Sequence, residues 1–181
     1  MEKDTISVTG LGYVGLPVAI AFNKKNYNVI GFDTNDDRVY DLSNYQDHTN
    51  EVTENELKKS NIVFTSDYRD LRKASFHIIT VPTPIDEFNN PDLSLVESAC
   101  EQIGKVLNRG DIVVIESTVY PGVTEEIAVP VIEKFSKLKL NEDFSIGYSP
   151  ERINPADPNH RFENIQKVLS ASDQNTLRTM E

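Results

Sequence analysis

A glycine-rich turn between an apolar strand pattern and a helical pattern constrains the fold more than any other feature of this sequence. The segment TISVT (5–9) leads into GLGYVG, which places Gly10, Gly12 and Gly15 in GxGxxG spacing before a helix expected over about 13–25. In this arrangement the first glycine permits the tight turn, the second lets a pyrophosphate approach the backbone, and the third lets helix and strand pack closely. The spacing therefore predicts a dinucleotide-binding βαβ unit, and a turn that is merely tight is the alternative.

The remainder of the chain alternates short β-rich runs with helical patterns. Further strands are expected at 28–33, 62–66, 76–82, 111–117, 144–149 and 167–171, and helices at 35–44, 93–107 and 122–137. Several of the runs are apolar throughout, as in parallel strands that helices cover on both faces. The pattern predicts an α/β fold with a doubly wound, mostly parallel sheet, a Rossmann-like domain over residues 1–171. The polar segments 45–60, 83–92 and 150–166 are expected to be loops, and 172–181 the start of a connecting helix that the chain does not complete.

Asp33 stands at the end of the second expected strand, 18 residues after Gly15, close to the spacing of about 20 at which an acid binds ribose in this motif. A carboxylate here accepts a hydrogen bond from a ribose hydroxyl and repels a 2′-phosphate, so NAD is the expected cofactor. Arg38 is a second candidate contact, although an arginine near this position can also serve the 2′-phosphate of NADP. The alternative role for Asp33 is the N-cap of the following helix.

The acidic composition bears on the class of partner. The chain has 18 Lys and Arg against 29 Asp and Glu, a net charge of −11, and such a field repels nucleic acid. No apolar run approaches the roughly 20 residues that cross a bilayer, and the N-terminus shows no signal-peptide pattern. No nucleic acid, no membrane partner and a cytoplasmic location are therefore expected. The histidines, His48, His77 and His160, show no metal-ligand spacing, so no metal is expected.

Cys100 is the only cysteine, which makes it a candidate nucleophile. Its neighbours Val96, Ala99, Ile103 and Val106 recur at the spacing of one helical face, which places the thiol in an apolar stripe. A thiol among apolar neighbours stays protonated and unreactive. Cys100 is therefore expected to be a packing residue, with the chemistry elsewhere.

Three further motifs follow the glycine-rich turn: VPTP (81–84), ESTVYPG (116–122) and GYSPERINPAD (147–157). Together with GLGYVGLP (10–17) they make the chain resemble the NAD-binding domain of the UDP-glucose/GDP-mannose dehydrogenase family. Members of that family oxidise the 6-hydroxymethyl group of a nucleotide sugar to a carboxylate in two NAD-dependent steps, through an aldehyde held on a cysteine. The resemblance places that cysteine, the active-site lysine, and the central and C-terminal domains beyond residue 181. It implies that this chain binds NAD without turnover, and that the full-length protein is a homodimer through the missing central helix.

The resemblance also assigns roles to individual residues. It implies cofactor contacts from Gly10, Leu11, Gly12, Tyr13, Val14, Gly15, Asp33, Arg38, Val81, Pro82, Thr83, Ser117 and Thr118. By the same resemblance Thr118 orders a water near the reacting carbon and Glu151 positions water and proton transfer, which makes these two the catalytic candidates. Glu151, Arg152 and Asn154 are the candidate substrate contacts. Thr83 and Thr118 are alternatively ordinary turn or cap threonines, and Glu151 an exposed loop acid.

The loop around Glu151 also bears on the substrate. Pro155 stands where the UDP-glucose branch has a second glutamate, and PERINP is similar instead to the branch that acts on UDP-N-acetylhexosamines in capsule and O-antigen pathways. UDP-GlcNAc or UDP-GalNAc is the expected substrate, with UDP-ManNAc disfavoured, for synthesis of a surface polysaccharide precursor. Two other classes stay open: a β-hydroxyacid dehydrogenase, whose first domain also starts with GxGxxG, and a naturally short NAD-binding module without catalysis.

Overall fold

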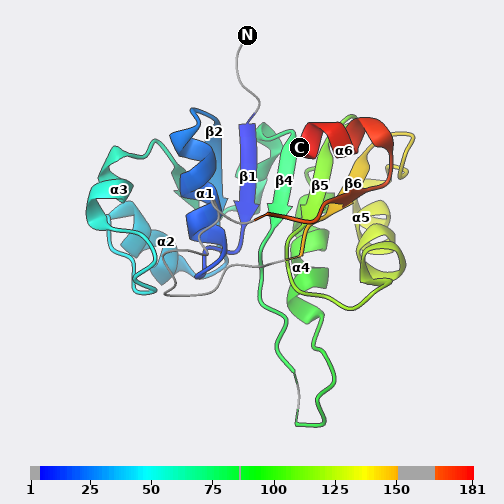
Figure 1. The fold of residues 1–181 in the computed structure, drawn as a ribbon, viewed down its shortest axis with the longest axis horizontal. Coiled ribbons are helices and arrows are strands. Elements are labelled where there is room, and N and C mark those ends of the chain that lie inside the picture. Colours follow the sequence, from blue (N-terminus) through cyan, green and yellow to red (C-terminus); the bar gives the residue numbers. More distant parts are fainter. Residues whose placement is uncertain (1–4, 86, 151–165) are drawn as a thin grey trace.

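A twisted parallel sheet forms the centre of the molecule (Figure 1). The computed structural model describes residues 5–85, 87–150 and 166–181, and within them seven strands lie in the order β3-β2-β1-β4-β5-β6-β7. The strands are β1 (Thr5–Thr9), β2 (Asn28–Phe32), β3 (Val63–Thr65), β4 (Phe76–Ile79), β5 (Ile112–Ile115), β6 (Ser145–Tyr148) and β7 (Ser170–Ala171). All neighbouring pairs are parallel except β6 and β7. The predicted doubly wound α/β fold is confirmed.

Helices cover both faces of this sheet. They are α1 (Gly15–Lys24), α2 (Asp36–Ser43), α3 (Glu54–Lys59), α4 (Ser94–Gly104), α5 (Val129–Ser136) and α6 (Gln174–Met180), with a 3₁₀ helix η1 (Tyr68–Lys73) and a π-helical turn η2 (Thr124–Ala128). Successive strand residues point to opposite faces, so Val29 and Ile78 pack in the cluster that contains α1, whereas Ile30 and Ile79 pack in the cluster that contains α4 and α5. None of the described helices is both long and apolar enough to cross a membrane.

Several predicted segments differ from the structure. The strand expected over 167–171 forms only at Ser170–Ala171, and η1 was not predicted. The segment 45–60, expected to be a loop, contains α3, because Thr53 and Glu56 form a reciprocal capping box and Leu57 is buried. The helix expected over 122–137 begins instead as the π-helical turn η2 before α5. Pro130 lies in the first turn of α5 and has no N–H to donate to the preceding turn, which accounts for the irregular start.

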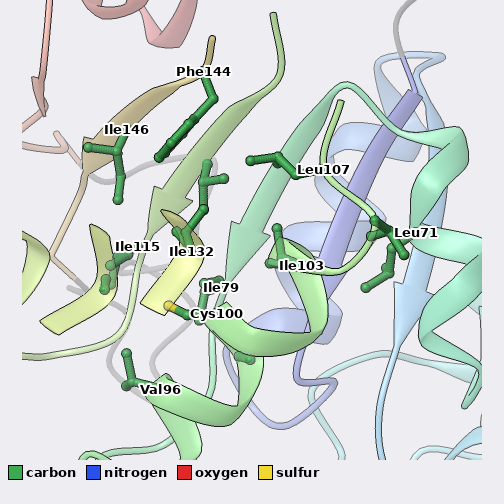
Figure 2. Packing of buried hydrophobic residues seen from close by; sticks show 14 of the residues in the cluster. Leu71, Ile79, Val96, Cys100, Ile103, Leu107, Ile115, Ile132, Phe144 and Ile146 are labelled. Carbon is green, nitrogen blue, oxygen red and sulfur yellow. The ribbon is translucent and has the colours of Figure 1, made fainter. Parts of the chain in front are cut away.

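Cys100 lies in the larger of the two apolar clusters, between α4 and the sheet. Figure 2 shows its sulfur among buried aliphatic side chains, including Ile79, Ile115 and Ile132. The side chain has no exposed surface, and burial, with a smaller contribution from Glu97, raises the pKa of the thiol to about 12. The thiol therefore stays protonated at neutral pH, and the expectation that Cys100 is a packing residue is confirmed.

A buried polar chain crosses β1, β4 and the start of β5. Ser7 pairs with His77 in the register of β1 and β4, and its Oγ lies 2.8 Å from His77 Nδ1. The other ring nitrogen, Nε2, lies 3.4 Å from Asp111 Oδ2, which also accepts a 2.7 Å hydrogen bond from the Asn108 amide. Serine, histidine and aspartate in this order resemble a nucleophilic triad, but all three are buried. These three hydrogen-bonded side chains therefore stabilise the sheet and cannot contact a substrate.

The burial of Cys100 makes its reactivity a test of the packing. Ellman's reagent should label the native chain far more slowly than the urea-unfolded chain, because labelling must wait for the core to open. Labelling should stay slow up to about pH 10, since the pKa of the thiol is raised from 9.0 to about 12. The variant Leu95→Cys adds an exposed thiol on the same helix and should gain one rapidly labelled group. Rapid labelling of the unaltered native chain would contradict this packing.

The capping box of α3 should make the free energy of unfolding decrease at acidic pH. Burial raises the pKa of Glu56, but hydrogen bonds from Lys24 and Thr53 outweigh that effect and bring the pKa to about 2. The carboxylate therefore stabilises the fold above about pH 4.5, and this contribution is lost as the pH falls toward 2. In urea titrations Glu56→Gln should lower the free energy of unfolding at pH 7 by up to about 1 kcal/mol. The difference should disappear on acidification, and Glu54→Gln, which removes an exposed pair with Lys58, is the matched control.

Candidate functional site

The three glycines of the turn between β1 and α1 have different surroundings. Gly10 has φ +93°, a left-handed conformation that side chains disfavour. A Cβ on Gly15 would overlap the carbonyl oxygen of Gly10 and the hydroxyl of Thr80. A Cβ on Gly12, by contrast, would meet no atom within 4 Å. Gly10 and Gly15 are therefore required by the fold, whereas the space at Gly12 lies open to a ligand.

The start of α1 presents free backbone donors beside Gly12. In the part of the chain that the structure describes, the amides of Gly12, Tyr13 and Val14 donate no hydrogen bond. No acidic residue lies in the first turn of α1 and no side chain caps it. Because the start of a helix carries a partial positive charge, these amides suit an anionic group such as a phosphate.

A pocket of about 500 Å³ lies at this end of α1. It is lined by Gly12, Tyr13, Val14, Thr80, Val81, Pro82, Thr83, Pro84, Glu116, Ser117 and Thr118. These residues come from the segments that follow β1, β4 and β5, at the carboxyl edge of the sheet where the chain order reverses between β1 and β4 (Figure 1). This position is where open α/β sheets bind ligands. Eight of the residues expected from the sequence to contact a cofactor line the pocket, and Thr80, Pro84 and Glu116 were not predicted.

Hydrogen bonds join the segments after β4 and β5. The hydroxyl of Thr83 donates to the carbonyl oxygen of Thr118 at 2.6 Å, and the hydroxyl of Ser117 donates to the carbonyl oxygen of Val81 at 2.6 Å. The structure thus brings together Thr83 and Thr118, which were predicted separately from two motifs. Ser117 is buried, whereas Thr118 is exposed at the pocket.

Glu116 is a charged residue in the pocket wall that the sequence analysis did not select. Its Oε1 lies 2.5 Å from Lys167 Nζ, and both side chains are largely buried. A buried carboxylate needs such a partner, because an isolated charge is strongly disfavoured away from water. The sequence does contain a signal for this residue, because Glu116 directly follows the apolar run IVVI, at the end of an expected strand. The ion pair connects the end of β5 to the segment before β7.

Asp33 and Arg38 both contact the glycine-rich turn at Leu11 and do not line the pocket. Asp33 Oδ2 accepts a hydrogen bond from the Leu11 amide at 2.8 Å, and Arg38 Nε donates to the Leu11 carbonyl oxygen at 2.8 Å. The N-cap of α2 is Asn35, whose side chain accepts from the amides of Asp37 and Arg38. The alternative reading of Asp33 as this N-cap is therefore wrong.

The remaining predicted site residues lie outside the described part of the chain. They are Glu151, Arg152 and Asn154, the candidate substrate contacts. Within the described ranges, no three His, Cys, Asp or Glu side chains form a group that could hold a metal ion.

Comparison with known proteins agrees with this geometry. The model of the UDP-glucose/GDP-mannose dehydrogenase family, NAD binding domain, matches residues 4–181. Protein CapL of Staphylococcus aureus is 57% identical over 176 residues, which are 97% of this chain and 41% of the relative. The UDP-N-acetyl-D-glucosamine 6-dehydrogenase of Pseudomonas aeruginosa is 56% identical over 173 residues, 95% of this chain and 41% of the relative. The chain thus spans 41% of the length of these two curated relatives.

Solved structures share the fold. The UDP-D-ManNAc dehydrogenase of Pyrococcus horikoshii has a TM-score of 0.88 and 30% sequence identity, over 97% of this chain and 43% of that one. A ternary complex of GDP-mannose dehydrogenase from Pseudomonas aeruginosa has a TM-score of 0.78 and 27% identity, over 86% of this chain and 37% of that one.

The different surroundings of Gly12 and Gly15 predict opposite effects of the same substitution. Gly12→Ala should leave the free energy of unfolding within about 0.5 kcal/mol, because the added methyl group meets open space. It should nevertheless weaken NADH binding by roughly tenfold or more, since the methyl group occupies the position at which a pyrophosphate approaches. Gly15→Ala should lower the free energy of unfolding by roughly 1–3 kcal/mol through overpacking. Urea unfolding followed by circular dichroism and titration of NADH fluorescence measure the two effects, and equal NADH affinity in Gly12→Ala would contradict this site.

Proposed function

Because the chain belongs to the UDP-glucose/GDP-mannose dehydrogenase family as an NAD-binding domain, we propose that it is the coenzyme half of an NAD-dependent UDP-N-acetylhexosamine 6-dehydrogenase. The proposed reaction oxidises the C6 alcohol of the sugar to a carboxylate in two hydride transfers, for a surface polysaccharide precursor. The observation that carries the proposal is the open position at Gly12, beside backbone amides at the start of α1 that donate to no group in the described part of the chain and belong to residues lining the pocket.

The residues at this edge fit NAD in three places. The amides of Gly12, Tyr13 and Val14 suit its pyrophosphate. Asp33, beside the turn, suits a ribose hydroxyl of the adenosine. The pocket wall of Val81, Pro82, Thr83, Ser117 and Thr118 suits the nicotinamide end. When bound, NAD supplies the hydride acceptor, and these residues of the chain bind and orient it.

Thr83 and Thr118 are the proposed positioning and catalytic groups of the described chain. The Thr83 hydroxyl is engaged by the Thr118 carbonyl oxygen, so it holds the two pocket segments at a fixed separation. The Thr118 side chain is exposed at the pocket and is therefore available to hold a water molecule near the reacting carbon. In the proposal Glu151 positions water and proton transfer, and Glu151, Arg152 and Asn154 contact the substrate.

The identity of close relatives supports the choice of sugar. Two relatives at 56% and 51% identity are UDP-N-acetyl-D-glucosamine 6-dehydrogenases, whereas the UDP-N-acetyl-D-mannosamine dehydrogenases are 36% and 37% identical over 83% and 86% of the chain. We therefore favour UDP-GlcNAc. UDP-GalNAc stays the second candidate as an expectation from the sequence, and a relative named NDP-N-acetyl-D-galactosaminuronic acid dehydrogenase is 34% identical over 83% of this chain. UDP-ManNAc is the least favoured of the three substrates.

The proposal also covers the longer protein. We propose that residues 1–171 form the NAD-binding domain, that 172–181 begin the helix toward the central domain, and that the nucleophilic cysteine and the lysine belong to the part of the protein beyond Glu181. The homodimer and the cytoplasmic location expected from the sequence stay predictions.

Coenzyme binding and turnover should separate in this chain. Titration with NADH should give saturable binding, because the whole proposed coenzyme site lies within the 181 residues. Oxidation of UDP-GlcNAc, UDP-GalNAc or UDP-ManNAc, followed as NADH absorbance at 340 nm, should stay at background, because the proposal places the nucleophile elsewhere. Lack of NADH binding would contradict the coenzyme site, and measurable turnover would contradict the proposed division of the protein.

A further inference from the structure

The segment between α2 and α3 folds around the side chain of Asp47. Asp47 Oδ1 accepts hydrogen bonds from the amide and the hydroxyl of Thr49, at 3.0 and 2.7 Å. Oδ2 accepts from the amides of Glu51 and Val52, both at 3.0 Å. Val52 is itself buried in the cluster that contains α1. These contacts fix the position of the Asp47 carboxylate against the body of the domain.

The same carboxylate forms an ion pair with Arg38. Arg38 Nη1 lies 2.8 Å from Asp47 Oδ1, and the two side chains are 11% and 1% exposed. Burial raises the pKa of Asp47, but the hydrogen bonds from Thr49 and Val52 and the Arg38 guanidinium outweigh this effect, and the pKa lies below its ordinary value. Asp47 is therefore ionised at neutral pH, and its negative charge lies directly against the positive charge of Arg38.

Arg38 in turn reaches the glycine-rich turn at the residue that Asp33 also contacts. Its Nε donates to the Leu11 carbonyl oxygen, and Asp33 accepts from the Leu11 amide. Both side chains thus contact Leu11. The Arg38 guanidinium therefore lies close to the position proposed for the adenosine ribose beside Asp33. Arg38 Nη2 is buried and has no hydrogen-bond acceptor within the described part of the chain, so the guanidinium acts on a ligand through its charge and not through an exposed donor.

We propose that Asp47 is a specificity-determining residue of the coenzyme site, which neutralises Arg38 so that the site accepts a ribose hydroxyl and rejects a 2′-phosphate. The inference rests on the proposed coenzyme site. An arginine beside the ribose commonly binds the phosphate of NADP, and here that arginine is already paired. A 2′-phosphate on the ribose beside Asp33 would meet that carboxylate, and the charge of Arg38 is already balanced by the buried Asp47, whereas a neutral hydroxyl needs only hydrogen bonds.

The test compares NADH and NADPH affinities in variants of the chain. Asp47→Asn keeps the shape of the side chain but removes its charge. The ratio of the NADPH Kd to the NADH Kd should fall by about tenfold, because the unpaired guanidinium charge then attracts the 2′-phosphate. The gain should come from tighter NADPH binding, and it should disappear in the double variant Asp47→Asn with Arg38→Gln, because the freed guanidinium is then absent.

Thr49→Val is the matched control. It removes the hydroxyl that donates to both carboxylate oxygens of Asp47 but leaves the charges of Asp47 and Arg38 in place, so the Kd ratio should stay unchanged. If Asp47→Asn fails to fold by circular dichroism, Asp47→Ser supplies a hydroxyl that accepts turn amides and carries the same prediction. An unchanged ratio in a folded, NADH-binding Asp47 variant overturns the inference, as does an equal loss for both coenzymes. No NADH binding by the unaltered chain would overturn the proposed coenzyme site as well.

Discussion

The close contact between the start of α1 and the end of β1 is the constraint on which the site depends. Gly15 lies directly over the Gly10 carbonyl oxygen and the Thr80 hydroxyl, and that hydroxyl donates to the carbonyl oxygens of Thr9 and Gly10 at 3.0 and 2.8 Å. The contact joins β1, α1 and the end of β4 through the Thr80 hydroxyl, and it leaves no room for a side chain at Gly15. It holds the start of α1 at the carboxyl edge of the sheet, where Gly12, Tyr13 and Val14 line the pocket.

The strongly acidic composition and a site for an anionic coenzyme are compatible because the site uses uncharged donors. The chain carries a net charge of −11, so the average field opposes an approaching pyrophosphate. Backbone amides and the helix dipole act within the first turn and do not depend on that average. The cationic Arg38 beside the turn is paired with Asp47, so the charge of Asp47 offsets the positive charge of Arg38.

The sequence predicted most of the fold, since the strand and helix patterns have strong periodicities and the glycine spacing locates the turn. It also predicted eight pocket residues, because they belong to motifs that follow strands and resemble those of the family's NAD-binding domain. It missed α3, whose capping box of Thr53 and Glu56 lies in a polar segment with little apolar periodicity. It did not predict the ion pairs of Glu116 with Lys167 and of Arg38 with Asp47. The partners are separated by 51 and 9 positions, and only the folded chain brings them together.

The burial of Cys100 has a practical consequence for later work on this domain. The chain contains one cysteine, and its thiol is enclosed by the core between α4 and the sheet (Figure 2). A cysteine introduced at an exposed position can therefore carry a fluorophore or spin label selectively, with the native residue left in place. The distance between the sheet edge and any added domain then becomes measurable by spectroscopy without first redesigning the interior.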